Sequence, residues 1–79
     1  MTRDSPDDNE VVQTAVEAAE DVILSRYSRS DLRDIDIGVS FEDGRLSIDI
    51  YLNAPGDAER VAEDAALAAR AAVDDLFDV

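Results

Sequence analysis

Three arginines form the most specific candidate binding site in the sequence. They are Arg26, Arg29 and Arg33, which fall at or just beyond the end of an expected helix. Guanidinium groups pair bidentately with carboxylate and phosphate, so the cluster can anchor an acidic partner or a small anion. It can equally stabilise the negative end of the helix dipole and form local ion pairs with Asp31, Asp34 and Glu20. Both interpretations stay open.

The carboxylates give no comparably specific site. Segments 31–36 and 74–78 each carry three aspartates, whose oxygens suit Ca²⁺ or Mg²⁺. Neither segment has the turn glycine and closing glutamate of a calcium loop. In a chain with twenty acidic residues such groupings arise by chance. We therefore expect no resident metal ion and no other cofactor.

Nucleophilic catalysis by Ser-His or Cys-His pairs is excluded, because the chain has no histidine and no cysteine. Two carboxylates could share acid–base work only where burial separates their pKa values. The abundance of acidic residues makes any such pair unspecific. We expect a protein that is not an enzyme.

Two apolar side chains fall on otherwise polar faces. Tyr51 projects from the polar side of an expected hairpin, and Leu67 from the polar side of the second expected helix. Tyrosine is enriched at protein interfaces, whereas a single exposed leucine is ordinary. Tyr51 can instead cover Gly38 and Asp36 across the strands. With the three arginines, these two residues complete the set of candidate partner-binding residues.

The charge is strongly negative. Twenty acidic residues face seven basic ones, all arginine, for a net charge of −13. Direct binding to nucleic acid is disfavoured, because that affinity depends on cations that neutralise phosphates. The acids are spread through the chain, which disfavours an acidic tail and favours a salt-adapted surface over a nucleic-acid mimic. At molar salt the Debye length is about 3 Å, so repulsion between carboxylates is screened.

Nothing in the sequence indicates a membrane. No apolar run approaches the roughly 20 residues that a spanning helix needs. The N-terminus lacks the apolar core of a signal peptide. We expect a cytoplasmic protein without membrane association.

The organising element is a β-hairpin over Asp34–Leu52. Two alternating runs flank Asp43-Gly44, and this dipeptide favours a type I′ turn with positive φ at both residues. With that turn, the large apolar side chains fall on one face. The predicted pairs are Phe41 with Leu46, Val39 with Ile48, Ile37 with Ile50, and Ile35 with Leu52.

A helix is predicted on each side of the hairpin. Ser5 is the expected N-cap of the first helix, followed by Pro6, and the helix runs to about Tyr27. Its expected core stripe is Val12, Val16, Ala19, Ile23 and Tyr27. A second stripe beside it comprises Val11, Ala15, Ala18 and Val22. The second helix is predicted from Pro55–Asp57 to about Phe77 and is rich in alanine.

These elements predict an α+β fold in two layers, with order α-β-β-α. Residues 1–4 are expected to be a disordered end, and residues 5–79 a single domain. Both helices should cover one face of the antiparallel hairpin. Both strands are edges, which the charges at Asp36 and Asp49 can protect, but we expect a homodimer. It would form either by edge pairing into a four-stranded sheet or through the surplus stripe of the first helix.

The capped acidic helix, the hairpin IDIGVSFEDGRLSIDIYL and the alanine-rich helix after Asn53-Ala-Pro-Gly56 together resemble a known family. It is a family of small haloarchaeal proteins of unknown function. The resemblance covers nearly the whole chain. It implies the same fold and an archaeal cytoplasm, and it assigns no activity and no site residues.

The sequence therefore favours a non-catalytic, haloadapted interaction module or accessory subunit. It would bind a protein partner through the hairpin edge or its outer face. The alternative is a domain that binds a small anionic ligand or ion through the Arg26/Arg29/Arg33 loop.

Overall fold

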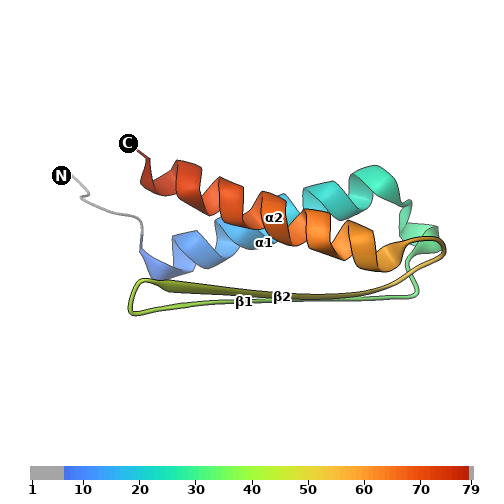
Figure 1. Ribbon diagram of the computed structural model, residues 1–79, viewed down its shortest axis with the longest axis horizontal. Helices are drawn as coiled ribbons and strands as arrows, with labels where there is room; N and C mark the ends of the chain where they lie inside the picture. Colours follow the sequence, from blue (N-terminus) through green and yellow to red (C-terminus); the bar gives the residue numbers. More distant parts are fainter. Residues whose placement is uncertain (1–6, 79) are drawn as a thin grey trace.

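The computed structural model describes residues 7–78 as two helices, one short 3₁₀ turn and one hairpin. The elements are α1 (Asp8–Arg26), η1 (Arg29–Asp31), β1 (Asp34–Glu42), β2 (Arg45–Asn53) and α2 (Ala58–Phe77). Both helices lie on the same face of the hairpin (Figure 1), and they pack against each other. The predicted α-β-β-α order and α+β class are confirmed. The expected disordered residues 1–4 lie outside the described part of the chain.

The hairpin forms as its sequence predicts. Asp43 and Gly44 have φ values of 52° and 76°, as a type I′ turn requires. The register runs from Glu42 opposite Arg45 to Asp34 opposite Asn53, without a bulge along its nine pairs. All four predicted apolar pairs are confirmed. The alternation of side chains thus places the whole apolar set under the helices.

The first helix begins later than expected. Asp7 is its N-cap, and the Asp7 Oδ1 atom accepts a hydrogen bond from the backbone N–H of Glu10 at 2.8 Å. The prediction of Ser5 as N-cap is wrong, because an extended Asp7 cannot lie inside a helix that started there. Ser5 and Pro6 themselves lie outside the described residues. At the other end the helix stops as predicted, with Tyr27 as the C-cap.

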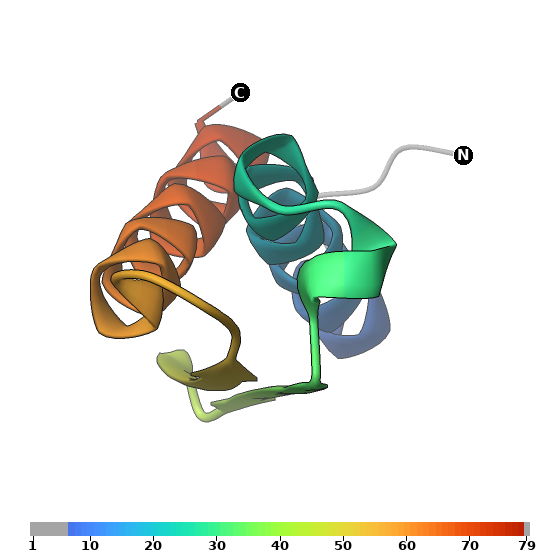
Figure 2. The ribbon, with the colours of Figure 1, turned by 90° about the vertical axis from the view of Figure 1, so that its right-hand side faces the viewer.

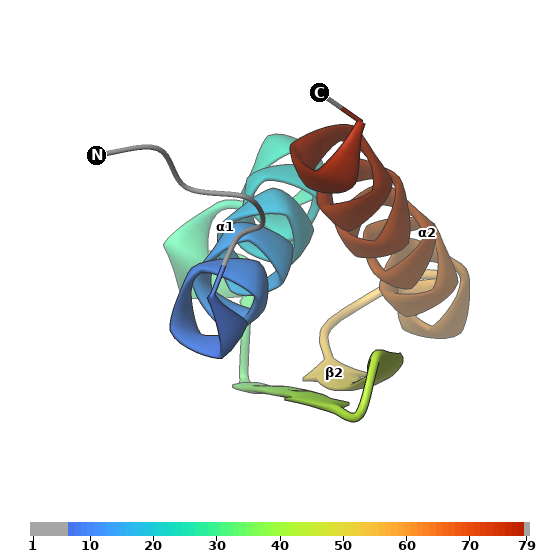
Figure 3. The same ribbon diagram turned by 90° about the vertical axis from the view of Figure 1, so that its left-hand side faces the viewer.

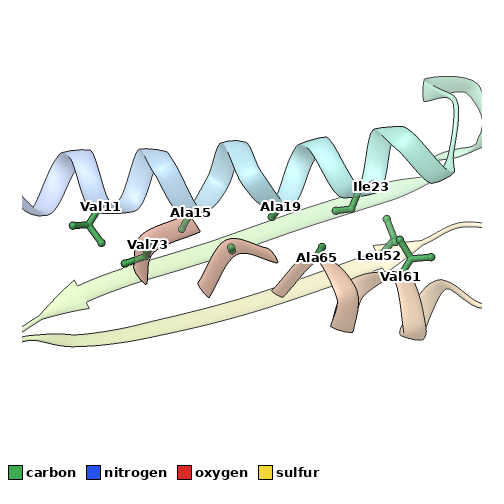
Figure 4. Packing of buried hydrophobic residues seen from close by; sticks show 9 residues of the cluster. Val11, Ala15, Ala19, Ile23, Leu52, Val61, Ala65 and Val73 are labelled. Carbon is green, nitrogen blue, oxygen red and sulfur yellow. The ribbon is translucent and has the colours of Figure 1, made fainter. Parts of the chain in front are cut away.

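The two helices meet along a seam of small side chains. Four buried residues at four-residue spacing come from each helix: Val11, Ala15, Ala19 and Ile23 from α1, and Val61, Ala65, Ala69 and Val73 from α2. Figure 4 shows this set, with valine or isoleucine at the ends and alanine between. Alanine lets two backbones approach closely. The seam is therefore narrow and buries little area for each residue.

The expected core stripe of α1 was partly wrong. Ala19 and Ile23 are buried, but Val12, Val16 and Tyr27 are only half-buried. Val11 and Ala15, assigned to the second stripe, are completely buried instead. The reason is that α1 must face both α2 and the hairpin. Val22 of the second stripe is half-buried and packs against the same core.

The layer between helices and hairpin is thin. Of the eight inward-facing apolar side chains of the hairpin, only Leu52 is buried, and Ile35 is 38% exposed. Ile23 and Val11 are the largest side chains that are fully buried. Figures 2 and 3 look along the layers and show the hairpin beneath both helices. Neither described helix is long and apolar enough to cross a bilayer.

Candidate functional site

Arg26 is already paired within the chain. Its Nη2 atom lies 3.1 Å from Oδ2 of Asp64 on α2, and the two side chains are 48% and 37% exposed. The sequence predicted local partners for this cluster, namely Asp31, Asp34 or Glu20. That was wrong for Arg26, because its ion pair joins the two helices instead of closing the loop.

The loop itself folds into η1, a 3₁₀ turn that the sequence analysis did not predict. The Asp31 carboxylate accepts hydrogen bonds from the backbone N–H of Ser28 at 3.3 Å and from its hydroxyl at 2.9 Å. This carboxylate therefore organises the turn and pairs with none of the arginines. Within residues 7–78, the exposed Arg29 and Arg33 make no ion pair and no side-chain hydrogen bond. Two of the three cluster residues thus remain open to an anion.

The acidic segments do not assemble a metal site. Among residues 7–78, no three carboxylates converge closely enough to hold a metal ion. The aspartates of segments 31–36 and 74–78 are all exposed. They form a solvated surface.

The outer face of the hairpin carries Tyr51. This side chain is 54% exposed and stands opposite Asp36 in the register. Its neighbours are small: Gly38 lies opposite Asp49, and Ser40 opposite Ser47. Neither helix covers this face (Figure 1). It is a shallow polar surface with one aromatic ring, as the sequence predicted.

The strand edges present unpaired backbone groups. A type I′ turn is closed by a hydrogen bond between the residues that flank it, here Glu42 and Arg45. In an antiparallel ladder, hydrogen-bonded and non-bonded pairs then alternate. The non-bonded pairs are those of the apolar residues, so their N–H and C=O groups point away from the hairpin. The outward groups belong to Ile35, Ile37, Val39 and Phe41 on β1, and to Leu46, Ile48, Ile50 and Leu52 on β2.

A second surface lies on α2, near the tip of the hairpin. A hollow of about 350 Å³ opens there between α2 and the hairpin. It is lined by Phe41, Gly44, Leu46, Arg70, Val73, Asp74 and Phe77. The rings of Phe41 and Phe77 lie 5.8 Å apart. Phe77 is 43% exposed.

Leu67 lies on the same helix and is 66% exposed, as expected from its place among polar residues. Sequence reasoning singled out Leu67 but missed Arg70, Asp74 and Phe77. The signal was present: these four residues recur at intervals of three, four and three, which places them on one side of a helix. The candidate residues are therefore not brought to one place. The arginines lie at one end of the hairpin, Tyr51 on its outer face, and Leu67 on α2.

Comparison with known proteins identifies one clear relative. An uncharacterised protein of Natronomonas pharaonis is 52% identical over 77 residues, which span 95% of this chain and 93% of the relative. No family model matches the chain. No solved structure matches it either.

Proposed function

Because this chain belongs to a family of small haloarchaeal proteins, we propose that it is a non-catalytic, salt-adapted interaction module that acts as a cytoplasmic homodimer. In this role the hairpin supplies the binding surfaces, through its edges and its outer face. The absence of histidine and cysteine from the sequence supports a role without catalysis.

The observation that carries this proposal is that both strand edges have unpaired backbone groups. Each strand has nine residues, and the register contains no bulge that would turn an edge away. Neither strand contains proline or lysine, two common devices that protect an edge. An isolated two-stranded hairpin is marginally stable, and an open edge is a template for another strand. Pairing with a second chain would satisfy these backbone groups.

The thin core supports the same proposal. A chain of 79 residues buries only about 60% of its unfolded surface. Four of the nine buried residues within positions 7–78 are alanines, which contribute little area. The half-buried apolar side chains of the hairpin would gain further burial in an assembly. Two-fold assembly is the commonest form for such a chain.

A protein partner would bind the surfaces of the hairpin that the homodimer does not occupy. Tyr51 supplies a rigid ring on the outer face, and the small side chains of Gly38, Ser40 and Ser47 let another backbone approach. A strand edge that remains unpaired offers backbone hydrogen bonds to an extended segment. Both surfaces lie on the hairpin.

Two measurements test the homodimer. Light scattering at molar KCl should give twice the chain mass of 8.6 kDa. Hydrogen exchange, read residue by residue by NMR, should then show protection of backbone amides that point away from the hairpin at its edge, such as those of Leu46 and Ile48. The amides of Ser47 and Asp49 are the internal control, since they point at the other strand and are hydrogen-bonded within the hairpin itself. A monomeric mass with fast exchange at every outward amide would contradict the proposal.

A second candidate function is supported by Arg29 and Arg33, which have no ion pair within residues 7–78. Two free guanidinium groups on one short loop can bind an anion such as phosphate. Inorganic phosphate should then raise the melting temperature, and the double variant R29Q/R33Q should abolish this shift. The control is R60Q, which removes an exposed arginine from α2. An equal shift in all three proteins would identify a general salt effect.

A further inference from the structure

We propose that the second copy of this chain docks antiparallel along one side of α2. The contact is made by a stripe of four residues, Leu67, Arg70, Asp74 and Phe77, called here the α2 stripe. The inference rests on the homodimer proposed above and names its interface.

The α2 stripe is exposed along its length. Leu67 is 66% exposed and Phe77 is 43% exposed, and both are large apolar side chains. Arg70 and Asp74 lie between them and are exposed as well. Residues three and four positions apart lie on the same side of a helix, so the four side chains form one continuous surface.

The two charges of the stripe have no partner within residues 7–78. Arg70 and Asp74 lie one helical turn apart, close enough for a pair within the helix, yet they form no ion pair and no side-chain hydrogen bond. Both groups also line the rim of the hollow beside the hairpin tip. Their charges are therefore available to another chain.

The order of side chains makes the stripe complementary to itself. It reads apolar, positive, negative, apolar. A two-fold axis brings a surface patch against its own copy in the opposite direction. Leu67 then meets Phe77 of the second copy, and Arg70 meets Asp74 of the second copy. Each contact occurs twice, so the interface would contain two apolar contacts and two ion pairs.

The corresponding side of α1 does not have this property. Its exposed residues include Glu17, Glu20 and Leu24, and antiparallel pairing would place acid against acid. Arg26, the one arginine of α1, is already bound to Asp64. Charge complementarity thus selects α2 over α1.

The choice of α2 also selects a strand edge. α2 packs mainly over β2, as α1 does over β1 (Figure 3). A two-fold axis that makes α2 antiparallel to its copy also makes β2 antiparallel to its copy. The outward N–H and C=O groups of Leu46 and Ile48 are then placed beside those of the second copy. The edge of β1 stays free for a different partner.

Disulfide trapping tests the register, because the natural chain has no cysteine. A mixture of the L67C and F77C variants, oxidised at molar KCl, should yield a covalent dimer that contains one copy of each. Either variant alone should stay largely unlinked. Its two cysteines would lie about 15 Å apart along the helix axis, whereas a disulfide needs Cα atoms within about 7 Å. A mixture of R60C with F77C is the matched control, since position 60 would face beyond the end of the second copy's helix.

Charge reversal provides a second test that needs no oxidation. R70D and D74R should each raise the dimer dissociation constant about tenfold, because each removes both ion pairs and opposes like charges. The double variant R70D/D74R restores opposite charges, so its dissociation constant should be close to that of the unchanged protein. R60D, a reversal of an arginine outside the stripe, should leave the dissociation constant unaltered.

The outcomes separate this inference from the broader proposal. A dimeric mass without the mixed disulfide would overturn the α2 stripe as the interface and leave the homodimer proposal intact. Equal dissociation constants for R70D and R60D would do the same. A monomeric mass at molar KCl would overturn both.

Discussion

The hydroxyl of Tyr27 donates a hydrogen bond to the carbonyl oxygen of Pro55 at 2.8 Å. Tyr27 is the C-cap of α1, and Pro55 lies in the loop that joins β2 to α2. The bond therefore connects the ends of two segments that are far apart in sequence. Gly56, which follows Pro55, has a φ of 82° and lies close to the same hydroxyl. Tyr27 thus closes the open end of the hairpin and is not an ordinary core residue.

Replacing Tyr27 by phenylalanine should destabilise the fold modestly. The variant Y27F keeps the half-buried ring and loses only the hydrogen bond, which is worth about 1 kcal/mol. For a domain of this size the Tm should fall by about 4–8 °C, measured by circular dichroism at molar KCl. The matched control is Y51F, because the Tyr51 side chain is exposed and makes no hydrogen bond within residues 7–78. Equal effects at the two positions would contradict the role given to Tyr27.

The two glycines of the hairpin should respond differently to alanine. Gly44 has a φ of 76°, which an L-residue adopts at a cost of about 1–2 kcal/mol, so G44A should lower the Tm. At Gly38 an added Cβ would meet the backbone oxygen of Asp49 at 3.6 Å, an ordinary contact. G38A should therefore change the free energy of unfolding by less than about 0.5 kcal/mol. A large loss of stability in G38A would mean that the outer face requires a residue without a side chain at this position. A partner docked closely against Gly38 would impose the same requirement.

The alanine seam should not tolerate larger side chains. Ala65 is completely buried between the helices, so A65L should cost about 1–3 kcal/mol by overpacking. A71L makes the same change at an exposed position of α2 and should be close to neutral. Urea unfolding at molar KCl measures both. If A65L were as stable as A71L, the close approach of the helices would not be required.

Stability should depend strongly on salt. The net charge of −13 and the lack of lysine leave most carboxylates without a nearby cation. Raising KCl from about 0.1 M to 1 M shortens the Debye length from about 10 Å to 3 Å and weakens this repulsion. We expect the Tm to rise by about 10 °C or more over this range. A complete, cooperative melt at an unchanged temperature in dilute buffer would argue against salt adaptation.

The hairpin could be predicted in full because its determinants are local. Asp43-Gly44 fixes the turn, and the alternation of side chains fixes the register from Phe41 opposite Leu46 outward. The extent of α2 also followed from nearby residues. Its predicted end at Phe77 is the observed one, and its start at Ala58 lies just beyond the predicted range.

The remaining features depend on distant parts of the chain. Periodicity alone cannot decide whether Val11 or Val12 faces the seam, because the answer depends on where α2 and the hairpin lie around α1. The ion pair of Arg26 with Asp64 and the hydrogen bond of Tyr27 with Pro55 each join residues from separate elements. For the N-cap, the sequence pattern favoured Ser5, which precedes Pro6. The structure uses Asp7.

The uninterrupted ladder between β1 and β2 has a further consequence for handling the protein. A protomer that loses its copy would expose backbone along both strands, where the outer-face charges of Asp34, Asp36 and Asp49 oppose growth of the sheet. Ordered aggregates, with a cross-β repeat near 4.7 Å, are expected at high protein concentration where salt screens these charges. Molar salt would thus have two opposite effects, since it stabilises the folded chain and weakens the repulsion that keeps free strand edges apart.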